Sequence, residues 1–248
     1  MRIEKLLPAL AAAALLAQPL AARAEEGVAY PHAGNDIRNT GSLQRGARNF
    51  MNYCSGCHSA QFVRYNRVAA DLGIGEPVLK ANLMFTSDKV YDPIKSAIRA
   101  DDARKWFGNA PPDLSLMARA RGSDYLYAFL RGFYLDPSRP TGVNNTAFPL
   151  TAMPHVLADL QGVQKAVFKP ASEAGGTPEI DRLELVAPGT LTPEQYDEFV
   201  RDTVNFLEYI GEPVQVQRRD LGVWVTLFLL VFAGFAYLLK REYFRDIH

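Results

Sequence analysis

The feature that most constrains the fold is the stretch Cys54-Ser55-Gly56-Cys57-His58, which contains both cysteines of the chain. Cys-x-x-Cys-His is the attachment pattern of c-type haem. Each thiol adds to one vinyl group of the porphyrin, and the histidine that follows is placed to bind the iron as its proximal ligand. The motif therefore predicts one covalent haem c, attached through Cys54 and Cys57 and ligated by His58, which the rest of the chain surrounds and anchors.

A Cys-x-x-Cys pair can also form a disulfide, a thioredoxin-like redox site or half of a zinc site. A thioredoxin-like site needs a βαβ frame, whereas residues 42–53 before the motif have the apolar spacing of a helix. A structural zinc site needs four ligands, and the other histidines lack finger spacing: His32, His155 and His248. The histidine beside the second cysteine favours haem over these alternatives, because none of them requires it.

The N-terminus has the pattern of an export signal. Arg2 and Lys5 precede an Ala- and Leu-rich run over residues 6–20, and Ala22-Arg23-Ala24 fits the small-x-small cleavage rule. Attachment of c-type haem needs reduced thiols on the outer side of a bacterial membrane, which agrees with export. We therefore expect residues 1–24 to be a cleaved signal peptide.

A second apolar run lies near the C-terminus, where residues 221–239 contain no charged side chain. At about 1.5 Å per residue a helix of this length spans about 28 Å, close to the hydrocarbon core of a bilayer. Trp224 and Tyr237 lie near its two ends, where aromatic side chains are common at the membrane interface. We expect an exported domain over residues 25–220, one transmembrane helix over 221–239 and a cytoplasmic tail over 240–248.

The composition and the apolar spacing indicate a mainly α-helical protein. The 248 residues include 27 basic and 27 acidic side chains, so no basic excess suggests nucleic acid as a partner. Helices are predicted over residues 42–53, 92–107, 124–131 and 193–210. Their expected N-terminal caps are Ser42, Asp92, Ser123 and Thr192, the last in a capping box with Gln195. Residues 134–155 and 169–190 are predicted to be loops, because glycine, proline and asparagine interrupt them.

The sixth ligand of the iron decides between electron transfer and chemistry on a bound small molecule. A methionine or histidine that closes this position favours outer-sphere electron transfer. Met51, Met84 and Met117 lie in surroundings where methionine usually fills a core. Met153 lies in a predicted loop, with a proline after it that restricts the backbone. The spacing alone favours Met153 and leaves His155 and Met117 as alternatives.

A series of motifs follows the haem pattern in a fixed order. They are Gln44-Arg45-Gly46, Tyr53 to Ser59, Pro111-Pro112-Asp113-Leu114-Ser115, Arg119-Ala120-Arg121, Asp124-Tyr125, Ala152-Met153-Pro154 and Glu212-Pro213 before the apolar run. In this order they resemble cytochrome c1, the haem subunit of quinol–cytochrome c reductase, over nearly the whole chain after residue 24. The long acidic insertion that mitochondrial relatives carry between the haem motif and the proline loop is missing from this sequence.

The resemblance implies a class I cytochrome c-like haem domain with long loops, in which His58 and Met153 are the axial ligands. It also implies that Arg121 pairs with a haem propionate, since an arginine can bind such a carboxylate through two hydrogen bonds. Tyr125 and the Pro111–Pro112 loop would lie against the haem. The family packs the first helix of the domain across the last one, which here would place Gly46 and Phe50 against Tyr196, Phe199 and Leu207.

The resemblance further implies an electron-transfer subunit that takes one electron from a Rieske iron–sulfur protein and passes it to a cytochrome c. Cytochrome b, the Rieske protein and membrane lipid would be its partners, with the haem domain on the periplasmic side of a bacterial inner membrane. The chain alone makes and breaks no substrate bond, so we expect a redox relay and not an enzyme by itself. A haem peroxidase or a gas sensor would need an exchangeable sixth position, and a free membrane-anchored shuttle would lack stable partners.

Overall fold

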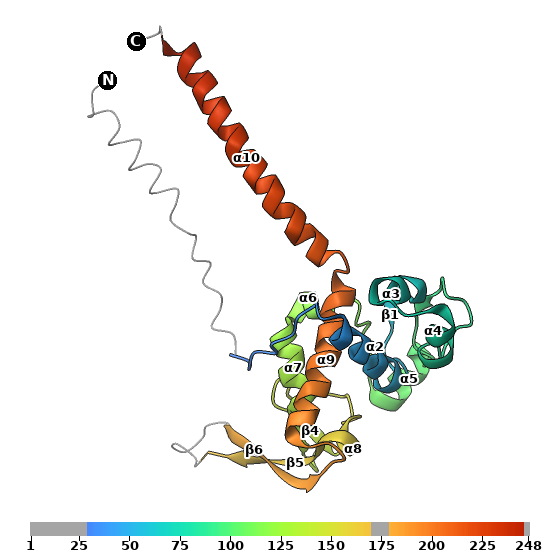
Figure 1. The fold of residues 1–248 in the computed structure, drawn as a ribbon. Coiled ribbons are helices and arrows are strands. Elements are labelled where there is room, and N and C mark those ends of the chain that lie inside the picture. Colours follow the sequence, from blue (N-terminus) through green and yellow to red (C-terminus); the bar gives the residue numbers. More distant parts are fainter. Residues whose placement is uncertain (1–28, 170–178, 246–248) are drawn as a thin grey trace. The chain divides into compact units, whose positions relative to one another are not determined.

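The computed structural model describes residues 29–169 and 179–245, so the predicted signal peptide lies outside the described residues. The helices in chain order are α2 (Thr40–Tyr53), α3 (Tyr65–Leu72), α4 (Glu76–Asn82), α5 (Ala100–Phe107), α6 (Met117–Arg121), α7 (Ser123–Arg131), α8 (Ala158–Gln161), α9 (Pro193–Gly211) and α10 (Gln215–Tyr243) (Figure 1). The strands of this part form antiparallel pairs: β1 (Ala60–Arg64) with β2 (Pro93–Ile94), β3 (Phe133–Leu135) with β4 (Val143–Asn145), and β5 (Gly162–Phe168) with β6 (Ile180–Pro188). Helix predominates, which confirms the predicted class.

Helices α2 and α9 cross so closely that only glycine fits at the contact. A Cβ atom added to Gly46 would lie 2.0 Å from the backbone oxygen of Asp202 and 2.7 Å from the Cβ atom of Phe206. The rings of Phe50 and Phe206 pack with their centroids 5.6 Å apart. The expected crossing of the first helix over the last helix of the domain is therefore confirmed, and Figure 1 shows the two elements side by side. The residues that Gly46 and Phe50 meet in these contacts are Asp202 and Phe206, which are not among those expected.

A buried polar seam runs through the same contact. The Asp202 carboxylate, in a residue only 4% exposed, accepts hydrogen bonds from Ser42 Oγ at 2.6 Å and from Arg45 Nε at 2.5 Å. Asn205, also buried, donates to Ser42 Oγ at 2.9 Å. A buried carboxylate costs free energy unless a cation and hydrogen bonds compensate it, and Arg45 with Ser42 supplies both. The seam therefore fixes the register of the two helices as well as their contact.

Three of the four predicted helix caps are wrong, Asp92 among them, and one is confirmed. Helix α2 begins at Thr40, and its cap is Asn39, which accepts a hydrogen bond from the Ser42 backbone. The Ser42 hydroxyl is used in the seam with Asp202 instead. Helix α7 begins at Ser123 itself, without a side-chain cap. Helix α9 has the full capping box between Thr192 and Gln195.

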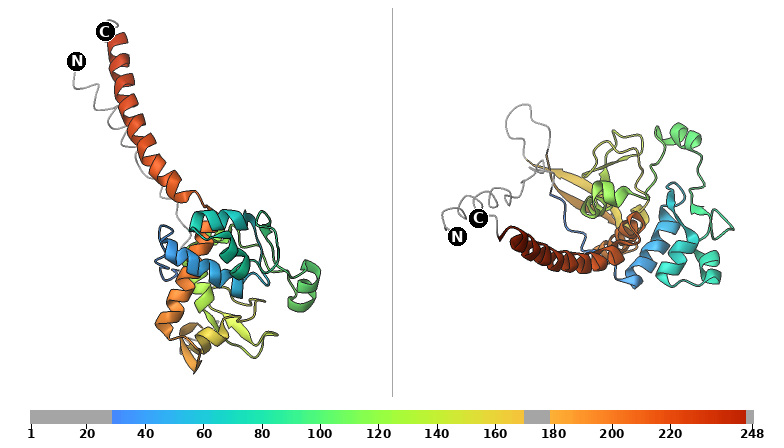
Figure 2. Two further views of the ribbon diagram at one scale, coloured as in Figure 1. Left: turned by 45° about the vertical axis from the view of Figure 1, so that its right-hand side comes forward. Right: turned by 90° about the horizontal axis from the view of Figure 1, so that it is seen from above.

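The predicted helix over residues 92–107 is only half correct. Pro93–Ile94 pairs with β1 as β2, and the helix begins at Ala100. Asp92 does not cap a helix, because its carboxylate accepts a hydrogen bond from Ser87 Oγ at 2.6 Å. The predicted end is correct, since Gly108 follows α5 with a φ of +81°. Figure 2 shows the resulting short α5 standing apart from α2 and α9 in both views.

The predicted loops contain strands. Residues 134–155 include β4 and most of β3, and residues 180–188 of the predicted second loop form β6, which pairs with β5. Two irregularities in the β5–β6 register interrupt the alternation of buried and exposed side chains on which a strand prediction depends. The loop prediction over residues 170–178 lies outside the described residues.

Helix α10 carries the predicted membrane segment. Within the described part of the chain it is the one helix long and apolar enough to cross a membrane, and none of its residues is buried. It is longer than the uncharged run 221–239, since it begins at Gln215 and ends at Tyr243. Asp220, just before the run, pairs with Arg38 at 2.7 Å. By its length and apolarity this helix is suited to cross a membrane once.

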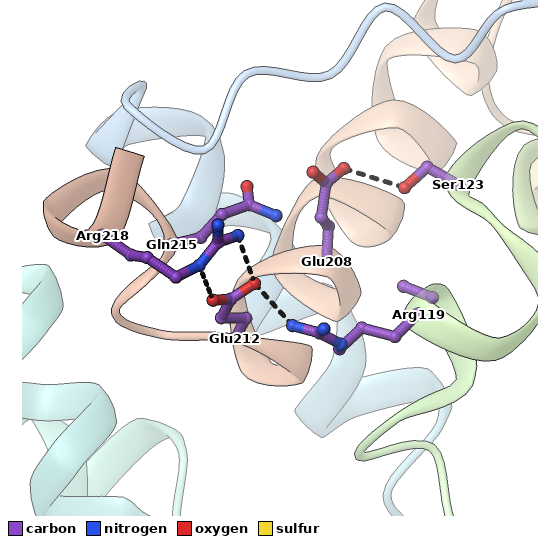
Figure 3. A pocket seen from close by; sticks show the side chains of 7 residues that line it. Arg119, Ser123, Glu208, Glu212, Gln215 and Arg218 are labelled. Atoms are coloured by element: carbon purple, nitrogen blue, oxygen red, sulfur yellow. Dashed lines mark hydrogen bonds and ion pairs between the residues drawn. The ribbon is translucent and has the colours of Figure 1, made fainter. Parts of the chain in front are cut away.

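Glu212 joins three helices where α9 ends and α10 begins (Figure 3). Its carboxylate accepts hydrogen bonds from Arg218 in α10 and from Arg119 in α6, and its side chain is 13% exposed. Hydrogen bonds from Arg218, and then from Arg119, hold the pKa of Glu212 below its usual range. The ionised carboxylate thus ties the start of the membrane helix to the domain.

Replacement of Gly46 by alanine tests the close helix crossing. Alanine favours a helix by about 1 kcal/mol over glycine, but its Cβ atom would force α2 and α9 apart, and overpacking costs about 1–3 kcal/mol. Gly41→Ala is the matched control. Gly41 lies in the same helix as Gly46, and a Cβ atom added there would meet no atom closer than 3.5 Å. Urea unfolding of the protein in detergent should show Gly46→Ala less stable than Gly41→Ala. Equal stability of the two variants would contradict the crossing.

Replacement of Glu212 by glutamine tests the joint between α9 and α10. The folded pKa of Glu212 is lowered, so its contribution is complete above the usual glutamate pKa and is lost as pH falls through the lower folded value. Amides 214–218 should exchange hydrogen faster in Glu212→Gln at neutral pH, and the difference from wild type should disappear at acidic pH. Glu208→Gln is the control, since Glu208 lines the same pocket but bonds Ser123 and Asn35. Unchanged exchange in Glu212→Gln would show that the arginines are not held through this carboxylate.

Candidate functional site

The Cys-x-x-Cys-His motif forms a tight turn at the end of α2. Cys54 is the C-terminal cap of that helix, and its amide donates to the Phe50 carbonyl at 2.9 Å. The amides of Cys57 and His58 both return to the Cys54 carbonyl, at 3.1 and 2.8 Å. The buried hydroxyl of Ser55 donates to the Met51 carbonyl at 2.7 Å. The turn therefore holds both cysteines and the histidine in one compact unit on a rigid helix.

Both cysteines are free thiols, and each is half-buried. Burial, and then the neighbouring Cys57, raises the pKa of Cys54 to about 12. A thioredoxin-like site instead lowers the pKa of its attacking cysteine. The strand pairs of the described residues are antiparallel, whereas a βαβ unit needs parallel strands. The geometry of the described chain thus fits the haem hypothesis and does not fit the thioredoxin alternative.

His58 is oriented by a second loop. Its Nδ1 atom lies 2.7 Å from the carbonyl oxygen of Pro112. A carbonyl can only accept, so Nδ1 carries the proton and Nε2 keeps a free lone pair, which is the tautomer that a metal needs. Burial lowers the pKa of His58, although Pro112 and Asp113 oppose that shift. Burial favours the neutral ring, and the Pro112 carbonyl orients it with Nε2 free, which is the state that an axial ligand needs.

The Pro112 segment is itself fastened to the chain that follows the motif. The Leu114 amide donates to the Ser59 carbonyl at 2.8 Å. Asp113 accepts the Gln61 amide at 3.0 Å, and Ser115 Oγ accepts the Phe62 amide at 3.1 Å. These three hydrogen bonds fix the position of the Pro112 carbonyl relative to the Cys54–His58 turn. In the sequence, Asp113 and Ser115 are part of the Pro111–Ser115 motif, but the sequence alone indicates no role for either.

Ser96 holds the motif from another side. Its amide donates to Ser59 Oγ at 2.9 Å, and its hydroxyl donates to the Gly56 carbonyl at 2.7 Å. Ser96 has no recognisable signal in the sequence, since a serine in a predicted helix gives no indication of such a contact. The motif is therefore clamped between the segments around Ser96 and Pro112.

The predicted pair Arg121 and Tyr125 lies together at the junction of α6 and α7. The guanidinium carbon of Arg121 is 5.7 Å from the centroid of the Tyr125 ring, and Arg121 is exposed. Tyr125 begins a row of rings that continues through Phe129 and Phe133 to His155, with centroids 6.1, 5.2 and 4.8 Å apart. This row connects the position predicted for a propionate partner with the loop that contains Met153.

Met153 differs from the other methionines in its surroundings. Met51 is buried in the core, and Met84 and Met117 pack against it, whereas Met153 is not part of that cluster in the described residues. Its amide donates to Thr151 Oγ1 at 3.3 Å in the loop before α8. A half-buried thioether outside the core is available as a ligand. The residues present thus supply two thiols, one oriented imidazole and one thioether, which is the donor set that a haem c with a closed sixth position requires.

Comparison with known proteins identifies the family of the chain. The model of the "Cytochrome C1 family" matches residues 36–165 and 184–247. The chain is 53% identical over 235 residues to "Cytochrome c1" of Allochromatium vinosum, covering 94% of this chain and 96% of that one. It is 46% identical over 236 residues to "Ammonia monooxygenase gamma subunit" of Nitrosomonas europaea, covering 95% and 96%. It is 29% identical over 227 residues to "Cytochrome c1" of Rhodospirillum rubrum, covering 83% and 81%. The chain belongs to the cytochrome c1 family.

Proposed function

We propose that this chain is the electron-transfer subunit of a cytochrome bc1 complex, and that it passes single electrons from a Rieske iron–sulfur protein to a cytochrome c. The observation that carries the proposal is the Cys54–His58 turn with the His58 ring held by Pro112, in a chain of the cytochrome c1 family. Covalent attachment keeps the cofactor in place, and an oriented imidazole gives the iron one constant ligand.

A bound haem c supplies reversible one-electron exchange at its iron. In our proposal Cys54 and Cys57 would attach it, and His58 and the Met153 thioether would be the protein ligands of its iron. The closed position excludes small molecules, which favours a relay over a peroxidase or a gas sensor. Arg121 would pair with a propionate, supported by its exposed guanidinium beside Tyr125. Tyr125 and the Pro111–Pro112 loop would form part of the pocket wall.

The proposed topology follows from the two apolar ends of the chain. Residues 1–24 would be removed after export, residues 25–220 would form the periplasmic domain, and residues 240–248 would remain in the cytoplasm of a bacterium. Residues 221–239 of α10 would span the inner membrane as a single helix. The joint at Glu212 would then lie close to the membrane surface on the periplasmic side.

Helix α10 would contact cytochrome b and lipid. Gly222 and Gly234 have no atom within 4 Å of an added Cβ, so both are open to a partner helix. Glycine lets helices approach closely in lipid, where packing and not the hydrophobic effect drives association. The chain would therefore act as one redox subunit of a larger quinol–cytochrome c oxidoreductase and not as an enzyme alone.

The name of the Nitrosomonas europaea relative gives a second candidate function. That protein, 46% identical over 95% of this chain, is called a subunit of an ammonia monooxygenase. A redox subunit of a monooxygenase would use the same haem turn, but it would deliver its electron to an oxygen-activating partner. The identity of the co-purifying subunits and of the electron donor separates the two candidates.

Replacement of Met153 by leucine tests the closed sixth position. Leucine has a similar volume but no donor atom, so the iron should become accessible. Because thioether ligation favours the ferrous state, the midpoint potential should fall, and the reduced protein should bind carbon monoxide. Met117→Leu is the control, since Met117 packs against the core. A wild-type spectrum and potential in Met153→Leu would exclude Met153 as the ligand.

Reconstitution of the purified complex tests the proposed position in the electron pathway. We expect the haem to be reduced by quinol only when the Rieske protein is present, and to be reoxidised by added cytochrome c. Stopped-flow absorbance with and without the Rieske subunit measures both steps. Purification of the chain with a monooxygenase and without cytochrome b, or rapid carbon monoxide binding by the wild-type reduced haem, would contradict the relay.

A further inference from the structure

His155 is a residue that the sequence leaves as an alternative ligand of the iron. It follows Pro154 in the Met153 loop and is partly exposed. Its ring stacks flat on Phe133, with the centroids 4.8 Å apart and the planes 4° from parallel. Phe133 is 1% exposed and belongs to β3. The imidazole therefore lies against the interior side of β3.

The Nε2 atom of His155 is buried and has no hydrogen-bond partner, and the same is true of the Oε1 atom of Gln161. Gln161 is the last residue of α8, and its Nε2 donates to the Arg131 carbonyl at 3.0 Å. Burial lowers the pKa of His155, while the Gly162 backbone and the Gln161 side chain lie near enough to oppose that shift. Both side chains thus carry a buried polar atom without a partner, and both lie against the segment 131–133, where His155 stacks on Phe133 and Gln161 bonds the Arg131 carbonyl.

Each unpaired buried polar group costs about 1–3 kcal/mol, whereas one bond between them would satisfy both. Gln161 is already fixed at its amide nitrogen, and Gln164 from β5 donates to the carbonyls of Arg131 and Phe133 at 3.0 Å each. The acceptor therefore sits on a rigid base. A histidine that carries its proton on Nε2 to meet this acceptor cannot use the same nitrogen to bind a metal.

We propose that His155 is a positioning residue, which stacks on Phe133 and donates from Nε2 to Gln161 Oε1 to hold the loop where Met153 serves as the iron ligand. The inference rests on the proposed ligation by Met153. It assigns the ring row Tyr125, Phe129 and Phe133 a role as the fixed support of that loop. It also takes the Nε2 atom of His155 out of the candidates for the sixth ligand.

The test compares two single variants of the full haem-loaded protein in detergent. His155→Phe keeps a ring for stacking and removes the donor, and Gln161→Leu removes the acceptor. Both should retain the thioether-to-iron charge-transfer band of the oxidised protein. Carbon monoxide binding to the reduced protein should become about tenfold faster in each, the equivalent of about 1.4 kcal/mol in loop opening. The double variant should be no faster than the faster single variant, because both changes remove the same bond.

Two further variants show whether the effect is specific. Gln161→Glu keeps an acceptor at the same place and should bind carbon monoxide at the wild-type rate. His32→Phe replaces an exposed histidine that pairs with Asp124, and it should also behave as wild type. These controls separate loss of the proposed bond from a general effect of the substitutions.

The proposal is overturned if His155→Phe loses the charge-transfer band as Met153→Leu does, since His155 or its neighbourhood would then ligate the iron directly. It is also overturned if both single variants bind carbon monoxide at the wild-type rate. Retention of the charge-transfer band in Met153→Leu would show that Met153 is not the ligand, and the proposal for His155 would then fail as well. None of these measurements uses quinol or a partner subunit, so they fail or succeed independently of the proposed electron pathway.

Discussion

The hydrogen bond from His58 Nδ1 to the Pro112 carbonyl is the interaction on which the site depends, because it joins segments 54 residues apart and sets the tautomer of the ligand. The motif alone places two thiols and a histidine in a turn. The second loop decides in which direction the imidazole points and how basic it is. Asp113, Leu114 and Ser115 fasten that loop to residues 59–62 after the motif, so in our proposal the haem c would be held by two segments at once.

A series of helix contacts links this turn to the membrane helix α10. The turn ends α2, α2 crosses α9 at Gly46 with no space for a side chain, and α9 ends at Glu212. Glu212 binds Arg218 at the start of α10. Three features make these contacts rigid. Gly46 lets α2 and α9 cross closely, the buried Asp202 carboxylate bonds Arg45, and Glu212 pairs with arginines of α6 and α10. A redox centre near a membrane needs such a chain of contacts, since electron transfer depends on a fixed distance to the partner.

The sequence was sufficient where the signal is local. The haem motif, the membrane helix and the Thr192–Gln195 capping box are short patterns, and all of them lie where the sequence indicates. Strand β2 was missed because its pairing with β1 is long-range, and Asp92 bonds Ser87 instead of a helix. Ser96 was missed for the same reason, since its partners Gly56 and Ser59 are far away in the chain. Arg121 rests on the family resemblance, because an exposed arginine has no pattern of its own. For Met153 the spacing alone left His155 and Met117 as alternatives, and the family resemblance decided between them.

The midpoint potential of Asp113→Ala tests the central role of the His58–Pro112 bond most directly. The change removes the acceptor of the Gln61 and Ser115 amides and frees the segment that carries Pro112. A weaker bond leaves the imidazole less basic, so the ferric state loses stabilisation and the potential should rise. Ser96→Ala, which loosens the motif from the other segment, should change the potential much less. Equal potentials in wild type and Asp113→Ala, with the haem still bound, would contradict the account.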